Sequence, residues 1–242
     1  DEIAMLSLPA DSRVEEATWS LDDIPLLDLA DSLLNGTPVT YEHIVVDEAQ
    51  DLTPMQFESI RRRSRTGGMT ILGDLAQGTS PWSPDSWEEA VLHLRHDRVP
   101  TEIAELTIGY RLPAEVHEVA MRLLPEIAPR LRAPEPVRYT GHQVEVAHCH
   151  PDELMAGVVD AVDHVIDAGL VGVIVSERER EAVAETLERA GFDWGMDLCP
   201  DGATVVVMTA PEAQGLEFDS VVVVEPADIA GECDRGLRAL FV

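Results

Sequence analysis

A short apolar run ends in paired acids in the stretch Ile44-Val45-Val46-Asp47-Glu48-Ala49-Gln50-Asp51. The run has the length and the β-branched composition of a buried strand. Such a strand delivers Asp47 and Glu48 to the carboxyl-terminal edge of a parallel sheet, where open α/β sheets bind their ligands. Asp47 suits Mg²⁺ there, and Glu48 suits the activation of a water molecule as general base. The structural alternative is an acid-rich helix N-terminus, which the helix dipole favours.

A second apolar run leads to a polar turn in the stretch Thr70-Ile71-Leu72-Gly73-Asp74-Leu75-Ala76-Gln77. Gln77 stands three residues after Asp74, and its neutral amide is suited to sense a γ-phosphate without adding charge. The structural alternative is an ordinary exit from a strand, because Gly-Asp is common turn chemistry. The position of this run in the next strand after the first motif favours the functional interpretation.

Apolar runs alternate with helical patterns along the chain, which predicts the fold class. Strand-like runs occupy residues 43–47, 69–73, 105–111, 144–148, 171–176, 204–209 and 220–225. Helical spacing covers residues 54–63, 113–124, 152–168 and 178–190. Thr53 caps the first of these helices, and Pro54 occupies its first turn. Strands that are apolar throughout and alternate with helices predict an α/β fold with a parallel sheet covered on both faces.

The length of 242 residues fits one large or two small domains. A polar stretch before residues 100–104 indicates a boundary, so we expect one domain at 1–103 and another at 104–242. Residues 125–141 are rich in Pro and Arg and indicate a long connection within the second half. The residues up to about Gly36 indicate a leader that is irregular at first and helical at 24–34.

The composition excludes several classes of protein. All 17 basic residues are Arg, so the chain has no lysine to place in a phosphate-binding P-loop. No run approaches the roughly 20 apolar residues of a membrane span. The acidic residues at positions 1 and 2 do not resemble the start of a signal peptide, and the three cysteines form no CxxC pair. We therefore expect a cytoplasmic protein without a membrane partner.

The formal net charge of −29 argues against broad binding of nucleic acid, because phosphate-tracking surfaces are basic. An acidic body suits a basic protein surface, although solubility alone also explains it. The dense basic run at residues 61–65 could contact nucleic acid or a protein partner. Such a run is more often a solvated helix end that the helix dipole favours.

Four stretches of the sequence together resemble the motifs of a known protein family. The strings VVDEAQD and ILGDLAQ are similar to motifs II and III of superfamily-one helicases of the UvrD/Rep type. Residues 106–111 are similar to motif IV, with Gly109 in place of the usual Asn, and residues 209–219 are similar to motif V. The order and approximate spacing match from Tyr41 onward. The resemblance implies two RecA-like domains, of which the first is incomplete in this chain.

Other stretches resemble one branch of these proteins, the HelD family. They are residues 18–28, the string Leu52-Thr53-Pro54-Met55-Gln56, and the path from Gly73 to Trp87. HelD proteins are helicase-like ATPases that bind RNA polymerase and help to release it from nucleic acid. The resemblance therefore implies ATP and Mg²⁺ as ligands and RNA polymerase as a partner.

The resemblance also implies a role for each matching residue. Asp47 would coordinate Mg²⁺ and Glu48 would activate water, while Gln77 would sense the γ-phosphate. Tyr110 would stack on the adenine, and Arg111 would act as an arginine finger on the γ-phosphate. Glu217 would form a hydrogen bond with the ribose, and Gly215 would allow the backbone to approach the nucleotide closely.

The chain departs from the helicase pattern in ways that limit its activity. Motif I is absent, and motif VI would follow the last residue, so we expect the C-terminal part of a larger ATPase that does not hydrolyse ATP alone. Motif V usually carries Lys where Gln214 stands. Residues 78–84 replace the aromatic and basic stretch with which translocating helicases meet single-stranded DNA. The alternatives are a UvrD/Rep-type DNA helicase or repair-nuclease subunit, and a non-catalytic protein-binding module.

Overall fold

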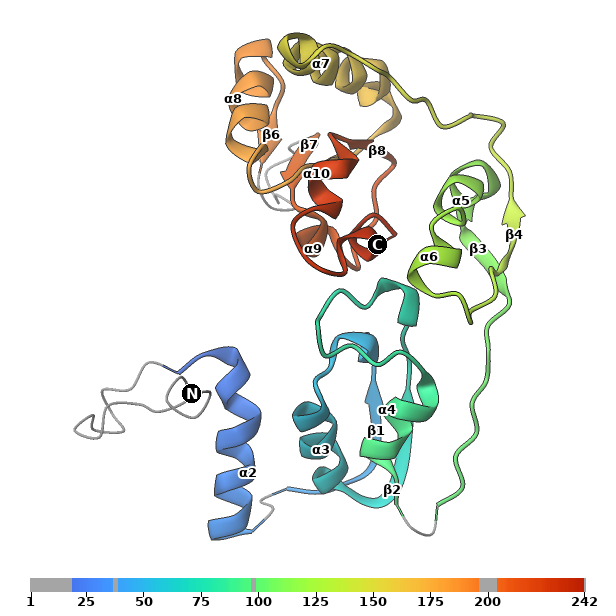
Figure 1. Cartoon of the computed structure of the whole chain (residues 1–242), viewed down its shortest axis with the longest axis vertical. Helices are drawn as coiled ribbons and strands as arrows, with labels where there is room; N and C mark the ends of the chain where they lie inside the picture. Colours follow the sequence, from blue (N-terminus) through green and yellow to red (C-terminus); the bar gives the residue numbers. More distant parts are fainter. Residues whose placement is uncertain (1–18, 37–38, 97–98, 196–203, 242) are drawn as a thin grey trace, which may run out of the picture. The chain divides into compact units, whose positions relative to one another are not determined.

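The computed structural model of the chain describes residues 19–36, 39–96, 99–195 and 204–241 (Figure 1). The chain divides into two compact units. The first comprises the described parts of Asp1–Leu72 and Trp87–Thr101, and the second comprises Gly73–Ser86 and the described parts of Glu102–Val242. The irregular part of the expected leader lies outside the described residues, and its helical part is present.

The first unit is a parallel pair of strands with helices. Its strands are β1 (Tyr41–Val46) and β2 (Ser64–Ile71). Its helices are α2 (Ile24–Asn35), α3 (Pro54–Arg63) and α4 (Trp87–Leu94), with short 3-10 turns η2 (Leu21–Asp23) and η3 (Ala49–Asp51). Helix α3 has the predicted bounds. Its capping box explains this, because the Gln56 amide N–H donates to Thr53 Oγ1 at 3.2 Å and the Thr53 N–H donates to Gln56 Oε1 at 2.7 Å.

One face of the β1–β2 pair forms the core of this unit. Phe57 from α3 and Ala90 from α4 are buried against Val46 and Met69 of the strands. Val45 points to the opposite face, because strand side chains alternate, and it is 66% exposed. The prediction of a sheet covered on both faces is therefore wrong for this pair among the described residues.

Helix α2 is fixed to α3 by a shared carboxylate. Asp28 accepts hydrogen bonds from Arg62 Nη2 at 2.5 Å and from Arg63 Nη1 at 2.9 Å. Arg63 is the main reason that the pKa of Asp28 lies far below its ordinary value, with Ser59 and Arg62 lowering it further and burial opposing them. Asp28 in turn raises the pKa of Arg63.

The rest of the basic run is paired as well. Arg61 binds Glu58 at 2.6 Å, and Arg65 pairs with Glu42. The side chain of Arg62 is only 12% exposed. The run does include the last turn of α3, as expected of a basic helix end, but Arg62 and Arg63 are not solvated there because they bind Asp28 of α2.

The second unit is larger and contains two parallel sheets. The small sheet pairs β3 (Ile108–Pro113) with β4 (Glu135–Arg138). The large sheet has the order β6-β7-β5-β8, from β5 (Val171–Ile174), β6 (Trp194–Gly195), β7 (Val205–Met208) and β8 (Ser220–Val223). The longer helices of this unit are α7 (Leu154–Val165) and α8 (Arg180–Ala190). Shorter elements are η4 (Leu75–Gln77), α5 (Ala114–Ala120), α6 (Leu124–Ile127), η5 (Pro151–Glu153), η6 (Ile166–Ala168), α9 (Ala210–Ala213), α10 (Pro226–Ala230) and α11 (Gly236–Ala239).

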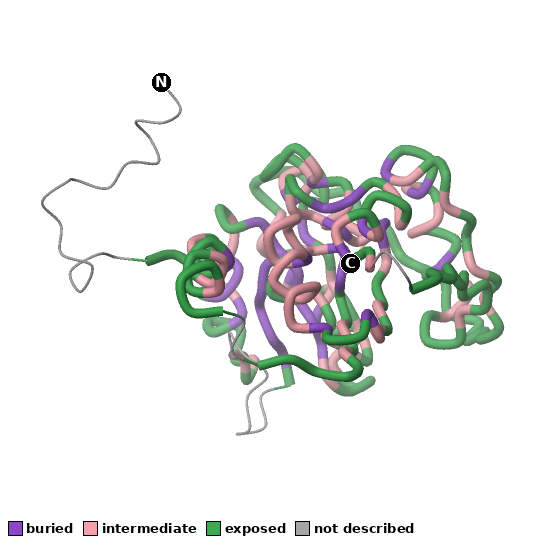
Figure 2. The backbone as a smooth tube through the Cα atoms, turned by 90° about the horizontal axis from the view of Figure 1, so that it is seen from below, coloured by how far each residue is buried: buried purple, intermediate pink, exposed green. Residues whose placement is uncertain are grey.

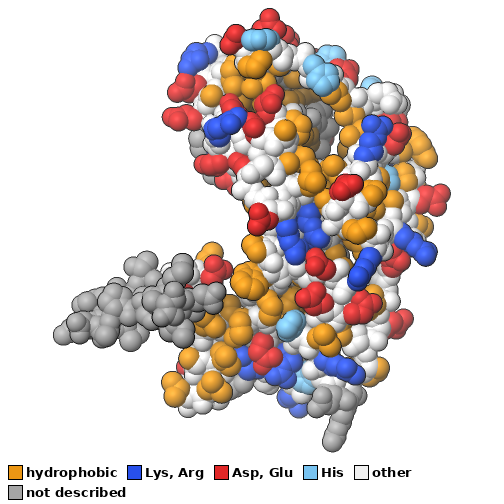
Figure 3. All heavy atoms as spheres, in the orientation of Figure 1, with side chains coloured by type: hydrophobic (Ala, Val, Ile, Leu, Met, Phe, Trp, Pro, Cys, Tyr) orange, Lys and Arg blue, Asp and Glu red, His pale blue; other side chains and the backbone are white. Residues whose placement is uncertain are grey.

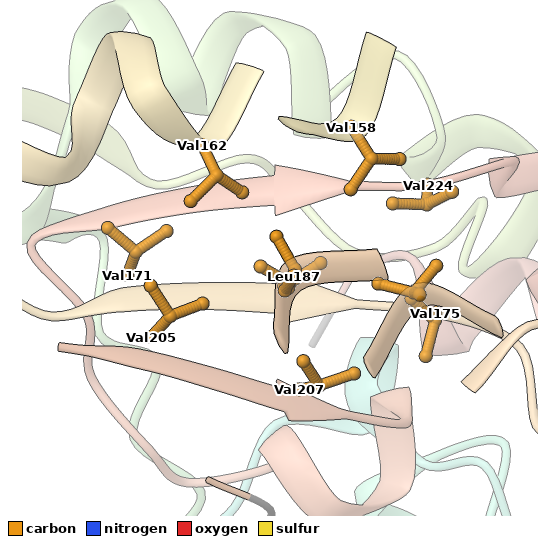
Figure 4. Close-up of a cluster of buried hydrophobic side chains, with 10 residues drawn as sticks. Val158, Val162, Val171, Val175, Leu187, Val205, Val207 and Val224 are labelled. Carbon is orange, nitrogen blue, oxygen red and sulfur yellow. The ribbon is translucent and has the colours of Figure 1, made fainter. Parts of the chain in front are cut away.

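The central strands β5 and β7 of the large sheet are covered on both faces, as predicted, whereas Val221 and Val223 of the edge strand β8 are 53% and 48% exposed. Val158 and Val162 of α7 and Leu187 of α8 pack on one face against alternate valines of the strands (Figure 4). Ile229 of α10 packs with Ile174, Val206 and Met208 in a separate cluster. Because both sets of side chains are buried, β5 and β7 are buried throughout and appear purple in Figure 2. All strand pairs in this sheet are parallel, so the fold class is α/β.

Three sequence-based assignments in this unit need correction. Residues 144–148 alternate in hydropathy but form no strand, and Val146 is 73% exposed. The expected connection at 125–141 contains β4, which pairs with β3. The helix expected at 113–124 ends at Ala120 as α5. A turn at 121–123 follows, and α6 begins at Leu124 with Pro125 in its first turn.

Candidate functional site

Asp47 and Glu48 follow β1 directly, and both are exposed. The Asp47 carboxylate accepts the N–H of Glu48 at 2.9 Å. The Ala49 N–H donates to the Leu72 carbonyl at 2.9 Å, which joins this turn to the end of β2. The prediction of a parallel strand that ends at this acidic pair is confirmed, but the prediction that the strand is buried is wrong, because none of the residues of β1 is buried.

Glu48 has a left-handed backbone, with φ 51° and ψ 38°. Residues with a side chain seldom adopt this region, and those that do cluster at functional sites. The conformation turns the chain sharply from β1 into η3. The side chain of Glu48 therefore does not follow the alternating directions of the side chains in β1.

Gln50 holds the carboxylate of Glu48. Its side chain is completely buried, and its Nε2 donates to Glu48 Oε2 at 2.7 Å. A longer contact of 3.4 Å joins the same amide to Asp51. Sequence reasoning did not assign a role to Gln50. Its role follows from its burial, because a buried amide must satisfy its hydrogen bonds, and burial of this residue leaves no signal in the local sequence.

Gln77 lies at the end of η4 and is half-buried. The carboxylate of Asp74 accepts the N–H of Ala76 at 2.9 Å and the side-chain amide of Gln77 at 3.1 Å. The predicted sensor amide is thus fixed by a carboxylate of its own turn. Leu75 and Ala76 are buried, so the turn is held both by their apolar contacts and by the hydrogen bonds to Asp74.

Arg111 and Glu217 are brought together by the fold, although they are far apart in sequence. Arg111 lies on β3, and its Nε is 2.9 Å from Glu217 Oε1. Their side chains are 70% and 66% exposed, so this ion pair is solvated and contributes little to stability. Tyr110 precedes Arg111 in the sequence and is 74% exposed.

Gly215 follows α9 and has a φ of 78°, which favours glycine. An added Cβ would meet nothing within 4 Å, so the space beside Gly215 is open. Thr209 and Glu212 form a capping box at the start of α9, with the Thr209 N–H donating to Glu212 at 2.9 Å. This backbone bond is the main cause of the lowered pKa of Glu212, and Arg180 of α8 adds to it.

The predicted site residues therefore fall into two sets. Asp47 and Glu48 belong to the first unit, and the second unit holds Gln77, Tyr110, Arg111, Gly215 and Glu217. The structure brings Glu48 to Gln50 and Arg111 to Glu217. Within the part of the chain that is described, no group of three or more His, Cys, Asp or Glu side chains forms a metal site.

An open hollow of about 240 Å³ lies after β5 and holds none of the predicted site residues. Its lining includes Asp228 and Glu232. The Glu232 carboxylate accepts the N–H of Glu177 at 2.6 Å, and Arg178 pairs with Asp228. The charged side chains of the hollow are therefore already engaged in hydrogen bonds and ion pairs within the protein.

No known protein-family model matches the sequence, and no curated protein matches it at a significant level. Across the described ranges, every helix is too short or too polar to cross a membrane.

Proposed function

We propose that this chain belongs to a HelD-like, helicase-related ATPase that binds RNA polymerase in the cytoplasm and releases it from nucleic acid. In this proposal, both units belong to RecA-like domains. The observation that carries the proposal is the acidic pair after β1. Its second carboxylate, on Glu48, sits on a left-handed backbone and is held at 2.7 Å by the buried amide of Gln50.

That arrangement supports a general base. A base must present a carboxylate in one direction, and a fixed hydrogen-bond donor reduces the number of directions available. The Gln50 amide uses one oxygen of Glu48 and leaves the other lone pairs for a water molecule. The position after a parallel strand is also the usual place for ligands in α/β folds.

Asp47 fits the expected magnesium ion. It is an exposed carboxylate at the same sheet edge, and Mg²⁺ takes one or two carboxylates together with water and phosphate oxygens. Bound Mg²⁺ would supply positive charge to the phosphates of ATP. Asp47 would hold the ion, while its bond from the Glu48 N–H keeps its own orientation fixed.

The second unit would supply the remaining contacts. Tyr110 is exposed and can stack on adenine, and Arg111 can neutralise charge on the γ-phosphate in the transition state. Glu217 can accept hydrogen bonds from the ribose, with Gly215 giving open space beside the backbone. Gln77 would report the γ-phosphate through its neutral amide. Since the 242 residues include no lysine, we expect no appreciable hydrolysis by this chain in isolation.

The test uses the native full-length protein. Its ATPase rate and its binding are measured with core RNA polymerase and, separately, with single-stranded DNA. We expect tight binding of polymerase and weak stimulation by DNA. Strong stimulation by DNA without polymerase binding would replace this proposal with a UvrD/Rep-type DNA helicase.

A matched pair of variants tests the catalytic assignment. We expect Glu48→Gln to lower kcat by roughly 100-fold or more, as for loss of a general base. Glu118→Gln changes the charge equally at an exposed position of α5 and is the control. If Glu48→Gln leaves both the ATPase rate and polymerase release unchanged, the chain is a non-catalytic binding module.

A further inference from the structure

Arg238 of α11 binds three backbone carbonyls at once. Its Nη1 donates to the carbonyl of Leu75 at 2.7 Å and to that of Gly78 at 3.3 Å, and its Nη2 donates to Ile127 at 2.9 Å. Its side chain is only 11% exposed. Burial lowers the pKa of Arg238, yet a guanidinium keeps its charge at any working pH.

Two of these carbonyls bracket Gln77. Leu75 begins η4 and Gly78 follows it, so the guanidinium spans the turn that carries the sensor amide. The last carbonyls of a short helical turn have no partner within it, and a cation is favourable there. Asp74 fixes the Gln77 side chain and Arg238 fixes the backbone around it, so the turn is held from two directions.

Helix α11 joins this turn to the rest of the second unit. Ala239 and Leu240 pack against the cluster of Ile174, Val206 and Met208 beneath the large sheet. Phe241 packs instead against the cluster of Ala76 with α6. The short segment 238–241 therefore contacts the sheet core and the Gln77 turn together.

We infer that Arg238 is a positioning residue that fixes the Gln77 turn to α11, so that the turn and the core of the second unit move as one body. The ATP-linked part of this inference rests on the proposed function. A γ-phosphate sensed at Gln77 would then displace α11 and the sheet behind it, and the sensor would not act through its own strand alone.

The experiment is amide hydrogen exchange on the native protein, with and without a non-hydrolysable ATP analogue. Arg238→Gln removes the charge and the guanidinium that reaches the three carbonyls, and Arg238→Lys keeps the charge and an N–H donor on a long side chain. Arg235→Gln is the control. Arg235 lies three residues before Arg238 and pairs with Asp85 at 3.4 Å, and Arg238 approaches the same carboxylate at 3.6 Å, so this variant removes a cation from the shared partner and leaves the donors to the carbonyls in place. We expect peptides covering residues 75–78 to exchange about tenfold faster in Arg238→Gln, partial rescue in Arg238→Lys, and wild-type exchange in Arg235→Gln.

Kinetics separate positioning from simple stability. We expect Arg238→Gln to lower kcat by about tenfold with the KM for ATP within about twofold, since sensing acts after binding. We also expect the analogue to protect both residues 75–78 and α11 in the wild type, and α11 no longer in Arg238→Gln.

Three results would overturn the inference. They are unchanged exchange at residues 75–78, an equal loss of protection throughout β5 and β7, and an undiminished response of α11 in Arg238→Gln. A wild-type protein that does not respond to nucleotide at all rejects the proposed function instead. The nucleotide-free exchange of the same variants then still decides whether Arg238 positions the turn.

Discussion

Glu48 combines a strained backbone with a side chain that a neighbour holds in place. A non-glycine residue in the left-handed region costs of order 1–3 kcal/mol, so the surrounding structure must enforce it. Here Asp47 accepts the N–H of Glu48, and Gln50 donates to its carboxylate. Glu225, which precedes α10 after β8, has the same backbone conformation with φ 44°. Both glutamates mark the point where a parallel strand gives way to a helical turn.

Gln50 tests whether the orientation of Glu48 matters. We expect Gln50→Leu to lower kcat for ATP roughly tenfold with little change in KM, because the carboxylate loses its fixed donor while its charge remains. Single-turnover hydrolysis by the native protein measures this. Gln143→Leu makes the same change at an exposed position and should behave as the wild type. Full activity in a folded Gln50→Leu protein would remove Gln50 from the site.

The Arg111–Glu217 pair tests the division of roles in the second unit. Glu217 would contact bound ATP in the ground state, so Glu217→Gln should raise KM more than it lowers kcat. Arg111 would act in the transition state, so Arg111→Gln should lower kcat by roughly 10³-fold. Neither change should alter the melting temperature measurably, because the pair is exposed.

A charge exchange provides the control for that pair. Arg111→Glu combined with Glu217→Arg re-forms the ion pair without restoring the chemistry of either position. Steady-state kinetics should therefore show no rescue. Recovery of activity in the exchanged protein would mean that the ion pair itself, and not the individual groups, is what matters.

At the scale of elements, the docking of α2 depends on pH. Asp28 has a lowered pKa in the folded state, so its stabilising contribution is complete above its unfolded pKa of about 3.9. The contribution is lost as the pH falls below that value toward the folded pKa. We expect α2 to lose amide protection below about pH 4 before the strands of either sheet do, as hydrogen exchange across pH 2–7 would show.

Variants of α2 make this pH dependence specific. Asp28→Asn should weaken the docking of α2 by about 2 kcal/mol at pH 7 and flatten its dependence on pH. Asp31→Asn is the control, because Asp31 is an exposed residue of the same helix that accepts from Asn35 at 2.9 Å. Equal pH profiles for the two variants would show that Asp28 is not the titrating group.

The elements that could be predicted from sequence are those that carry their own signal. Helix α3 begins with a capping box and a proline, and the strands β7 and β8 each contain three consecutive valines. Strand β4 was missed because Glu-Pro-Val-Arg is polar and contains a proline. Its strand conformation depends on its pairing with β3, which is a tertiary contact. The strand predicted at 144–148 is absent for the opposite reason. Its residues alternate in hydropathy as in a strand, but no neighbouring strand among the described residues pairs with them.

The candidate site divides in the same way. The acidic pair after β1 could be located because strand and acids are contiguous. Gln50, Arg238 and the pairing of Arg111 with Glu217 could not, since each depends on burial or on residues distant in the chain. Long-range contacts of this kind leave no local pattern.

At the scale of the whole molecule, acidic side chains are spread over the visible surface, and basic ones are fewer (Figure 3). Many arginines also form ion pairs within the protein, such as Arg62 with Asp28 and Arg180 with Glu212. A charge of −29 with its cations so engaged disfavours tracking along phosphates. It favours the approach of a basic protein surface at low ionic strength.

The two units also differ in how they are stabilised. A pair of strands with an open face is marginal, whereas the central strands β5 and β7 of the large sheet are covered on both faces and excluded from water. Val45 is 66% exposed in the first unit, and Val173 and Val205 are fully buried in the second. In increasing urea we expect amides of β1 and β2 in the 242-residue chain to lose protection before those of β5 and β7.

Core truncations show whether these transitions are separate. Leu187→Ala should destabilise the second unit by about 3 kcal/mol and Phe57→Ala the first by a similar amount, because both side chains are almost completely buried. Since the two residues lie in separate hydrophobic clusters, each variant should shift the urea midpoint of its own unit and leave the other within error. A single transition that both variants shift equally would show that the chain unfolds as one cooperative body.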